Sequence, residues 1–254
     1  MSMQLSTHAW VASGLRLDAD GAEHVPAALC EAELTLLRAL ADATLNGGSG
    51  VRVFGGAALR DALRPAGRVG HHACAVLGAA ARPVRAVMFD KTATTNWAVA
   101  WHQDRTIAVR AQCEAPGFGP WTIKAGVPHV EPPFDILAGM VTLRVHLDDC
   151  GQDNAPLLVV PGSHRLGQIP GPEAPAVAQR LGHAACLAAA GDIWVYATPI
   201  VHASERSRNP IRRRVLQVDY ANRELPCGLA WAGVAGAAAW TPRPRLPQRV
   251  TTLR

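Results

Sequence analysis

The chain has 254 residues, of which 49% are hydrophobic and 18% are charged, a balance that excludes an intrinsically disordered protein. The net charge is +5, but no recognisable nucleic-acid-binding module accompanies it, so nucleic acid is not expected as a partner. No apolar run is long enough to cross a membrane, and the amino terminus lacks the pattern of a secretion signal. These features predict a soluble cytoplasmic protein with a buried core.

The first third of the chain has the features of helices. Apolar residues at near-helical spacing predict a helix over residues 26–45, ended by the pair Gly47 and Gly48. A second helix is predicted over residues 57–63, before Pro65, and a third over residues 72–81, before Pro83. We therefore expect residues 1–82 to be helix-rich.

After Pro83 the sequence favours β-strands. Runs rich in β-branched and aromatic residues, separated by Gly, Pro, Asn and Asp, predict strands over 84–89, 97–104, 107–112, 140–148, 155–162, 191–196, 200–204 and 213–221. Because no long helix is expected between them, an antiparallel sandwich or barrel is predicted. Residues 117–133, with several prolines and glycines, are expected to form a loop that shapes a pocket, and residues 230–254 an extended tail.

Three residues could together hold a metal ion. His102 and Asp104 are two positions apart on a predicted strand, so their side chains leave the same face. His202 follows another predicted strand and supplies a third ligand. Two histidines and one carboxylate leave open positions on Fe(II), the arrangement of non-haem iron oxygenases. Catalytic zinc also accepts this set, so the three residues alone do not choose the metal.

Cationic residues follow His202. Ser204 and the run Arg212–Arg214 could bind a dicarboxylate, because the planar guanidinium pairs with a carboxylate through two charge-assisted hydrogen bonds. Alternation places Arg213 on one face of its strand, and Arg212 and Arg214 on the other. The pattern does not say which face points inward.

Three blocks of the sequence resemble the phytanoyl-CoA dioxygenase family of 2-oxoglutarate oxygenases: WHQD, LDDCGQDNAPLLVVPGSHRLG and GDIWVYATPIVHASERSRNPIRRRVLQVDYA. They occur in the family's order, and the resemblance covers about residues 84–222. It implies a mainly β fold with flanking helices, in which residues 84–222 form a double-stranded β-helix (a cupin-like jelly roll). Residues 1–254 would then be one oxygenase domain that uses Fe(II), 2-oxoglutarate and O2.

The resemblance also implies roles for single residues. His102, Asp104 and His202 match the iron ligands of the family, residue by residue. Arg213 matches the arginine that binds the distal carboxylate of 2-oxoglutarate, and Ser204 matches a hydroxyl that joins it. The resemblance thereby favours Arg213 over its two neighbours.

Further residues are candidates for contacts to the cosubstrate or the substrate. Gln103 and Lys91 resemble positions that approach the cosubstrate or the substrate in some relatives. Arg144 shares one face of its predicted strand with Thr142 and His146, and that face either lines a pocket or meets solvent. Trp121, in the 117–133 loop, is interpreted as part of the core or of a pocket wall.

The expected reaction is hydroxylation of a small molecule with release of succinate and CO2. Related halogenases lack the carboxylate ligand, whereas Asp104 fills that position here. The excess of arginines after His202 would suit an anionic substrate, and the sequence gives no indication of the oligomeric state. Two alternatives are a redox-inert metal enzyme and a small-molecule binding protein on the same scaffold. His129 and Glu131 form a second, weaker candidate metal pair.

Overall fold

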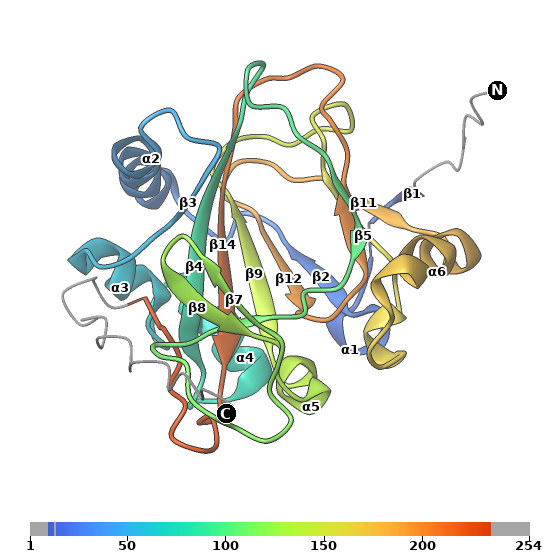
Figure 1. Ribbon diagram of the computed structural model, residues 1–254. Helices are drawn as coiled ribbons and strands as arrows, with labels where there is room; N and C mark the ends of the chain where they lie inside the picture. Colours follow the sequence, from blue (N-terminus) through green and yellow to red (C-terminus); the bar gives the residue numbers. More distant parts are fainter. Residues whose placement is uncertain (1–9, 13, 235–254) are drawn as a thin grey trace, which may run out of the picture.

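Two β-sheets face each other in the computed structural model, which describes residues 10–12 and 14–234 (Figure 1). The larger sheet has six strands in the order β2 (Ala22–Val25), β12 (Ile193–Ala197), β9 (Val141–His146), β14 (Arg213–Ala221), β4 (Arg82–Lys91) and β3 (Gly50–Arg52). The smaller sheet has five, in the order β1 (Trp10–Val11), β11 (Ala184–Cys186), β10 (Leu157–Val159), β13 (His202–Ser204) and β5 (Val99–His102). All pairings within the two sheets are antiparallel except that of β1 with β11.

A third, small sheet lies across one side of this pair. It consists of β6 (Ile107–Ala108), β8 (Val127–Val130) and β7 (Trp121–Lys124), and β7 and β8 form a hairpin (Figure 1). The helices are α1 (Leu17–Asp20), α2 (Glu31–Leu45), α3 (Ala57–Leu63), α4 (Gly70–Leu77), α5 (Phe134–Ala138) and α6 (Ala174–Leu181). None of the helices in the described ranges is both long and apolar enough to span a lipid bilayer.

The outer face of the six-stranded sheet is apolar and is covered by α2, α3 and α4. Met88, Leu143 and Leu216 of the sheet belong to one buried cluster with Leu37 of α2 and Leu59 of α3. Each such side chain contributes about 1.5–3 kcal/mol on burial. This layer fixes the sheet on the helices and leaves the opposite face of each strand for the interior between the sheets.

The inner face of the same sheet is unusually polar. Thr142, Arg144 and His146 of β9 and Arg213 of β14 are all at least nine-tenths buried, and they point toward the five-stranded sheet. The alternation of side chains in the sequence did not say whether this polar face points inward or toward solvent. The helices take the apolar face because burying it releases more free energy, so the charged face lines the interior.

The expectation of a mainly β fold with antiparallel sheets and helices is confirmed. Each predicted strand overlaps an observed one, and the helix over residues 57–63 is found within those bounds. The first predicted helix begins later, at Glu31, because Ala27 has a positive φ of 50° and donates its N–H to Asp192. The third is α4, which ends before Gly78, a residue with a φ of 81°.

Two expectations about loops were wrong. Residues 117–133 contain the β7–β8 hairpin, whose turn residues Ala125 and Gly126 both have positive φ, as a tight hairpin turn requires. The helix α6 also lies between predicted strands, where none was expected. The predicted extended tail lies mostly outside the described residues.

Neighbouring leucines of α2 test the apolar layer. Leu37 is 5% exposed and Leu36 is 61% exposed. We expect Leu37→Ala to lower the free energy of unfolding by about 3 kcal/mol, because it removes buried methyl groups and leaves a cavity. Leu36→Ala, the matched control, should change it by about 0.5 kcal/mol or less. Urea unfolding curves measure both, and equal losses would contradict the packing described here.

Candidate metal centre and cation pocket

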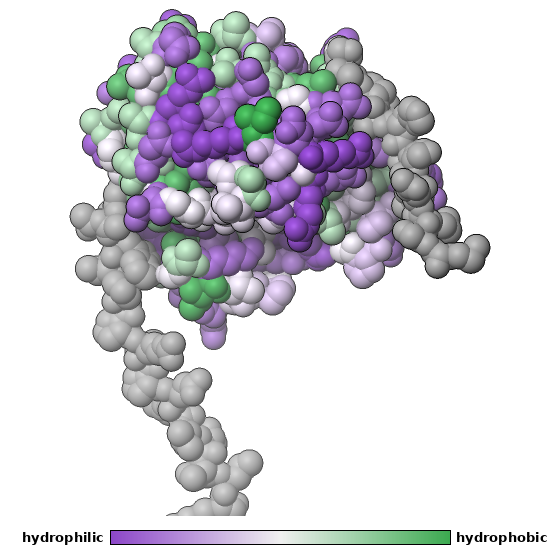
Figure 2. Space-filling view, turned by 90° about the horizontal axis from the view of Figure 1, so that it is seen from above, coloured by the Kyte–Doolittle hydropathy of each residue, from purple (hydrophilic) through white to green (hydrophobic). Residues whose placement is uncertain are grey.

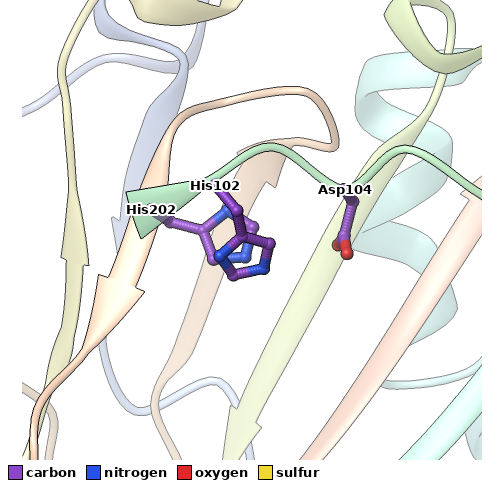
Figure 3. Close-up of side chains that lie close together, drawn as sticks. All are labelled: His102, Asp104 and His202. Atoms are coloured by element: carbon purple, nitrogen blue, oxygen red, sulfur yellow. The ribbon is translucent and has the colours of Figure 1, made fainter. Parts of the chain in front are cut away.

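Three side chains from two neighbouring strands meet between the sheets. His102 is the last residue of β5 and pairs directly with His202, the first residue of β13, so both imidazoles leave the same face. Their ring centroids are 4.2 Å apart. Asp104, from the segment after β5, directs its carboxylate toward the same space (Figure 3). One ligand atom from each of the three lies within 4.8 Å of the others.

Hydrogen bonds to the backbone leave the same nitrogen of both imidazoles available to a metal. Nδ1 of His102 is 2.8 Å from the carbonyl oxygen of Ala100, and Nδ1 of His202 is 2.9 Å from that of Ile200. A carbonyl only accepts, so each Nδ1 carries the proton and each Nε2 keeps a free lone pair. Burial also lowers the pKa of His202 to about 4, which keeps it neutral at physiological pH.

Arg85 lies between Asp104 and a second buried carboxylate, that of Asp219. Its Nη2 is 3.6 Å from Oδ2 of Asp104, and its Nε donates to Oδ2 of Asp219. Burial alone would raise the pKa of Asp104, but Arg85 and the two histidines outweigh it, so the pKa lies below its usual range. The carboxylate is therefore ionised, and the donor set fits a divalent transition metal.

A group of cations lies at the other end of the interior. Arg213 is 2% exposed, and its Nε and Nη1 are buried without a hydrogen-bond partner among the residues that the structure describes. Burial, with Arg144 nearby, lowers its pKa to about 10. Lys91 is 1% exposed and pairs in register with Arg213 across β4 and β14. Within the described ranges, none of these three cations forms an ion pair with a carboxylate, so this end fits a buried anion.

Ser204 lies beside this group. Its Oγ is 3.3 Å from Nζ of Lys91, which also donates to the carbonyl oxygens of Trp97 and Glu205. Arg144 donates from Nη1 to Oε1 of Gln217, and its Nε has no partner. The structure thus brings Lys91, Arg144, Ser204 and Arg213 into the interior that also holds the three candidate metal ligands.

The two arginines beside Arg213 are placed differently. Arg212 pairs with Asp42 and Asp90, and Arg214 pairs with Asp42 and Asp148. Arg214 on β14 and Arg212 just before it are therefore directed away from the interior.

Two other predicted residues are not brought to the pocket. The amide of Gln103 is fully engaged: Nε2 donates to the carbonyl oxygens of Gly167 and Pro199, and Oε1 accepts from the N–H of Ile169. Gln103 therefore anchors a loop. Trp121, on β7, packs against a separate apolar cluster that contains Val130.

The alternative metal pair does not assemble. The ring of His129 is held by Arg52 and by the carbonyl oxygen of Val127, and Glu131 pairs with Arg105. Sequence reasoning overlooked Arg85, Asp219 and Tyr196, whose hydroxyl is buried without a partner. The signal for Arg85 was available, because an arginine inside an otherwise apolar strand is rarely buried unless it is paired.

The upper end of the molecule, where the loops after β4 and β13 lie, is mostly hydrophilic in the view from above (Figure 2). Exposed residues of the second loop include Glu205, Arg206 and Arg208. The cations around Arg213 lie below this polar surface and are distinct from it, because they are buried.

Known proteins resemble this chain in sequence pattern and in fold. The model of the family described as phytanoyl-CoA dioxygenase (PhyH) matches residues 18–215. No individual curated protein matches the sequence. The epimerase SnoN, solved with Fe3+, alpha ketoglutarate and nogalamycin RO, is 20% identical with a TM-score of 0.61, and the match covers 94% of this chain and 91% of that one.

Two Streptomyces structures are also similar. AviO1 from Streptomyces viridochromogenes is 21% identical with a TM-score of 0.60, covering 84% of this chain and 94% of that one. HygX from Streptomyces hygroscopicus, solved with nickel and 2-oxoglutarate bound, is 15% identical with a TM-score of 0.56, covering 89% and 96%. At these identities the likeness concerns the fold, whereas the family model spans most of the sequence: the chain belongs to the phytanoyl-CoA dioxygenase family.

Proposed function

We propose that this protein is an Fe(II)- and 2-oxoglutarate-dependent dioxygenase that hydroxylates a small molecule and releases succinate and CO2. The observation that carries the proposal is Arg213, a buried guanidinium with two unpartnered N–H groups in the same interior as the His102, Asp104 and His202 cluster. The two facing sheets and their strand orders support a double-stranded β-helix within a single oxygenase domain.

The candidate metal ligands and the cations of the interior have distinct roles in this proposal. His102 and His202 present Nε2, and Asp104 presents its carboxylate, to Fe(II), which together with 2-oxoglutarate supplies the oxidising chemistry with O2. The guanidinium of Arg213 donates to the distal carboxylate of 2-oxoglutarate, which offsets the cost of burying the charge. Ser204 and Lys91 lie beside that carboxylate, and Arg144 adds positive potential along the path to the metal.

The unpaired cations argue against the alternative of a redox-inert metal protein, which would not need a buried site for a dicarboxylate. Hydroxylation is proposed because Asp104 occupies the carboxylate position that halogenases lack. Among proteins of similar fold are the epimerase SnoN and the carbocyclase SnoK, each described as alpha ketoglutarate dependent, so the scaffold supports more than one outcome.

Anaerobic spectroscopy tests the metal and the cosubstrate together. Addition of Fe(II) and 2-oxoglutarate without oxygen should produce the weak visible charge-transfer band of the chelate. Asp104→Ala should abolish or strongly weaken the band and should stop succinate formation when oxygen is admitted, because one of three protein ligands is lost. A wild-type protein without the band would contradict the proposed function.

Arg213→Met tests the cosubstrate site. The 2-oxoglutarate concentration that gives half of the maximal absorbance of the charge-transfer band should rise about 100-fold, because a buried carboxylate loses its paired cation. Arg213→Lys should recover only part of the affinity, since an ammonium lacks the guanidinium fork. The control is Arg212→Met, on the opposite face, which should leave that concentration unchanged. Equal effects of the two Met substitutions would remove Arg213 from the site.

Arg85→Met tests how Asp104 is held. We expect the affinity for Mn(II), measured by electron paramagnetic resonance of the free ion, to fall about 10–100-fold, as for other groups that orient a metal ligand. Arg82→Met, on the same strand but paired with the exposed Glu224, is the matched control. Unchanged metal binding in Arg85→Met would show that Asp104 needs no such support.

A further inference from the structure

A second set of cations lies beside Asp104, away from Arg213. Arg52, on β3, shares the inner face of the larger sheet with its partner Val87, and its Nη2 is 2.6 Å from Nε2 of His129 on β8. Lys124, at the end of β7, donates from Nζ to Oγ1 of Thr106 at 3.1 Å. Thr106 is two residues beyond Asp104, so the β7–β8 hairpin brings Lys124 toward the metal centre, and Arg52 of β3 lies nearby, within the influence of Arg85 and Asp219.

Arg52 is only partly satisfied by the protein. Its Nε and Nη1 are buried and have no hydrogen-bond partner within residues 10–12 and 14–234. The partner of its Nη2 is a neutral acceptor, because Nδ1 of His129 donates to the carbonyl oxygen of Val127 and burial lowers the pKa of His129 to about 4. His129 therefore positions Arg52 without balancing its charge.

The carboxylates of this region are already paired with other cations. Asp104 and Asp219 face Arg85, and Glu131 pairs with Arg105. In the described part of the chain, neither Arg52 nor Lys124 forms an ion pair. Arg52 is half-buried, and its buried Nε and Nη1 have no counter-charge at contact distance; a bound anion would offset this cost through charge-assisted hydrogen bonds.

This set is separate from the site proposed for 2-oxoglutarate. Arg52 pairs with Val87 and Arg213 pairs with Lys91, four residues along β4, which is about 13 Å of strand. The charged groups around them also differ: Arg52 is influenced by Arg85 and Asp219, and Arg213 by Arg144.

We propose that Arg52 and Lys124 bind an oxyanion of the primary substrate, a carboxylate or a phosphate, on the Asp104 side of the metal centre. The inference rests on the proposed function, since it gives that site its substrate class. The anionic group would fix the substrate at one end, and the bond to be oxidised would lie between this anchor and the metal.

Calorimetric titration with small probes tests the anchor. Benzoate, phenyl phosphate and neutral benzamide are titrated at constant ionic strength into anaerobic protein loaded with Fe(II) and saturating 2-oxoglutarate. We expect at least one anion to bind about tenfold or more tightly than benzamide, as hydrogen bonds to a charged group imply. The two anions distinguish a carboxylate site from a phosphate site.

Substitutions show which residues bind the anionic probe. Arg52→Met should remove the preference for the anion, Arg52→Lys should keep part of it, and Lys124→Met should reduce it several-fold. Arg180→Met, which removes an exposed cation of α6, is the control and should change nothing. If Arg52→Met does not fold, Lys124→Met carries the same test, because Lys124 is exposed.

Two results would overturn the proposal: wild-type protein that binds charged and neutral probes equally, or an anion preference that survives Arg52→Met and Lys124→Met. Failure of the proposed function is read separately, from absence of the visible band in the wild type. In that case the same titrations on metal-free protein still decide whether Arg52 and Lys124 bind an anion.

Discussion

The pairing of two short strands, β5 and β13, is the constraint on which the interior depends. It sets His102 directly opposite His202, and the chain that continues from β5 brings Asp104 to the same point within two residues. Hydrogen bonds from each Nδ1 to a carbonyl two residues back in the chain fix both rings. The positions of the two imidazoles are thus set by backbone pairing, whereas the carboxylate of Asp104 also faces Arg85 of β4.

The two faces of the six-stranded sheet differ in polarity. Its apolar side rests on α2, α3 and α4, and its other side carries charged groups that would be unstable in a dry core without partners. The stabilisation from the helix side allows the strands to tolerate this charge. Arg85 is balanced by Asp104 and Asp219, whereas Arg213 and Arg52 form no ion pair with any residue that the structure describes, and these two are the positions assigned to ligands.

Much of this arrangement could be predicted from the sequence. Alternating strands, the spacing of His102 and Asp104, and the three family blocks were sufficient for the mainly β fold and for the residues that meet at the centre. Alternation could not say which face of β14 points inward, because that depends on where the helices pack. The β7–β8 hairpin was missed because its prolines disfavour a strand and its turn is visible only in the φ angles of Ala125 and Gly126. The environment of Gln103 was also out of reach, since its amide bonds a loop more than sixty residues away.

The β7–β8 hairpin has a consequence for how such a protein can diversify. It carries His129 and Lys124 but none of the three candidate metal ligands, and among the described strands its two strands pair only with each other and with the short β6. Changes in its length or side chains can therefore alter what is recognised beside the metal while the two main sheets, with Arg213 and the His102–His202 pair, stay intact. Substrate choice and oxidative machinery occupy parts of the chain that can evolve at different rates.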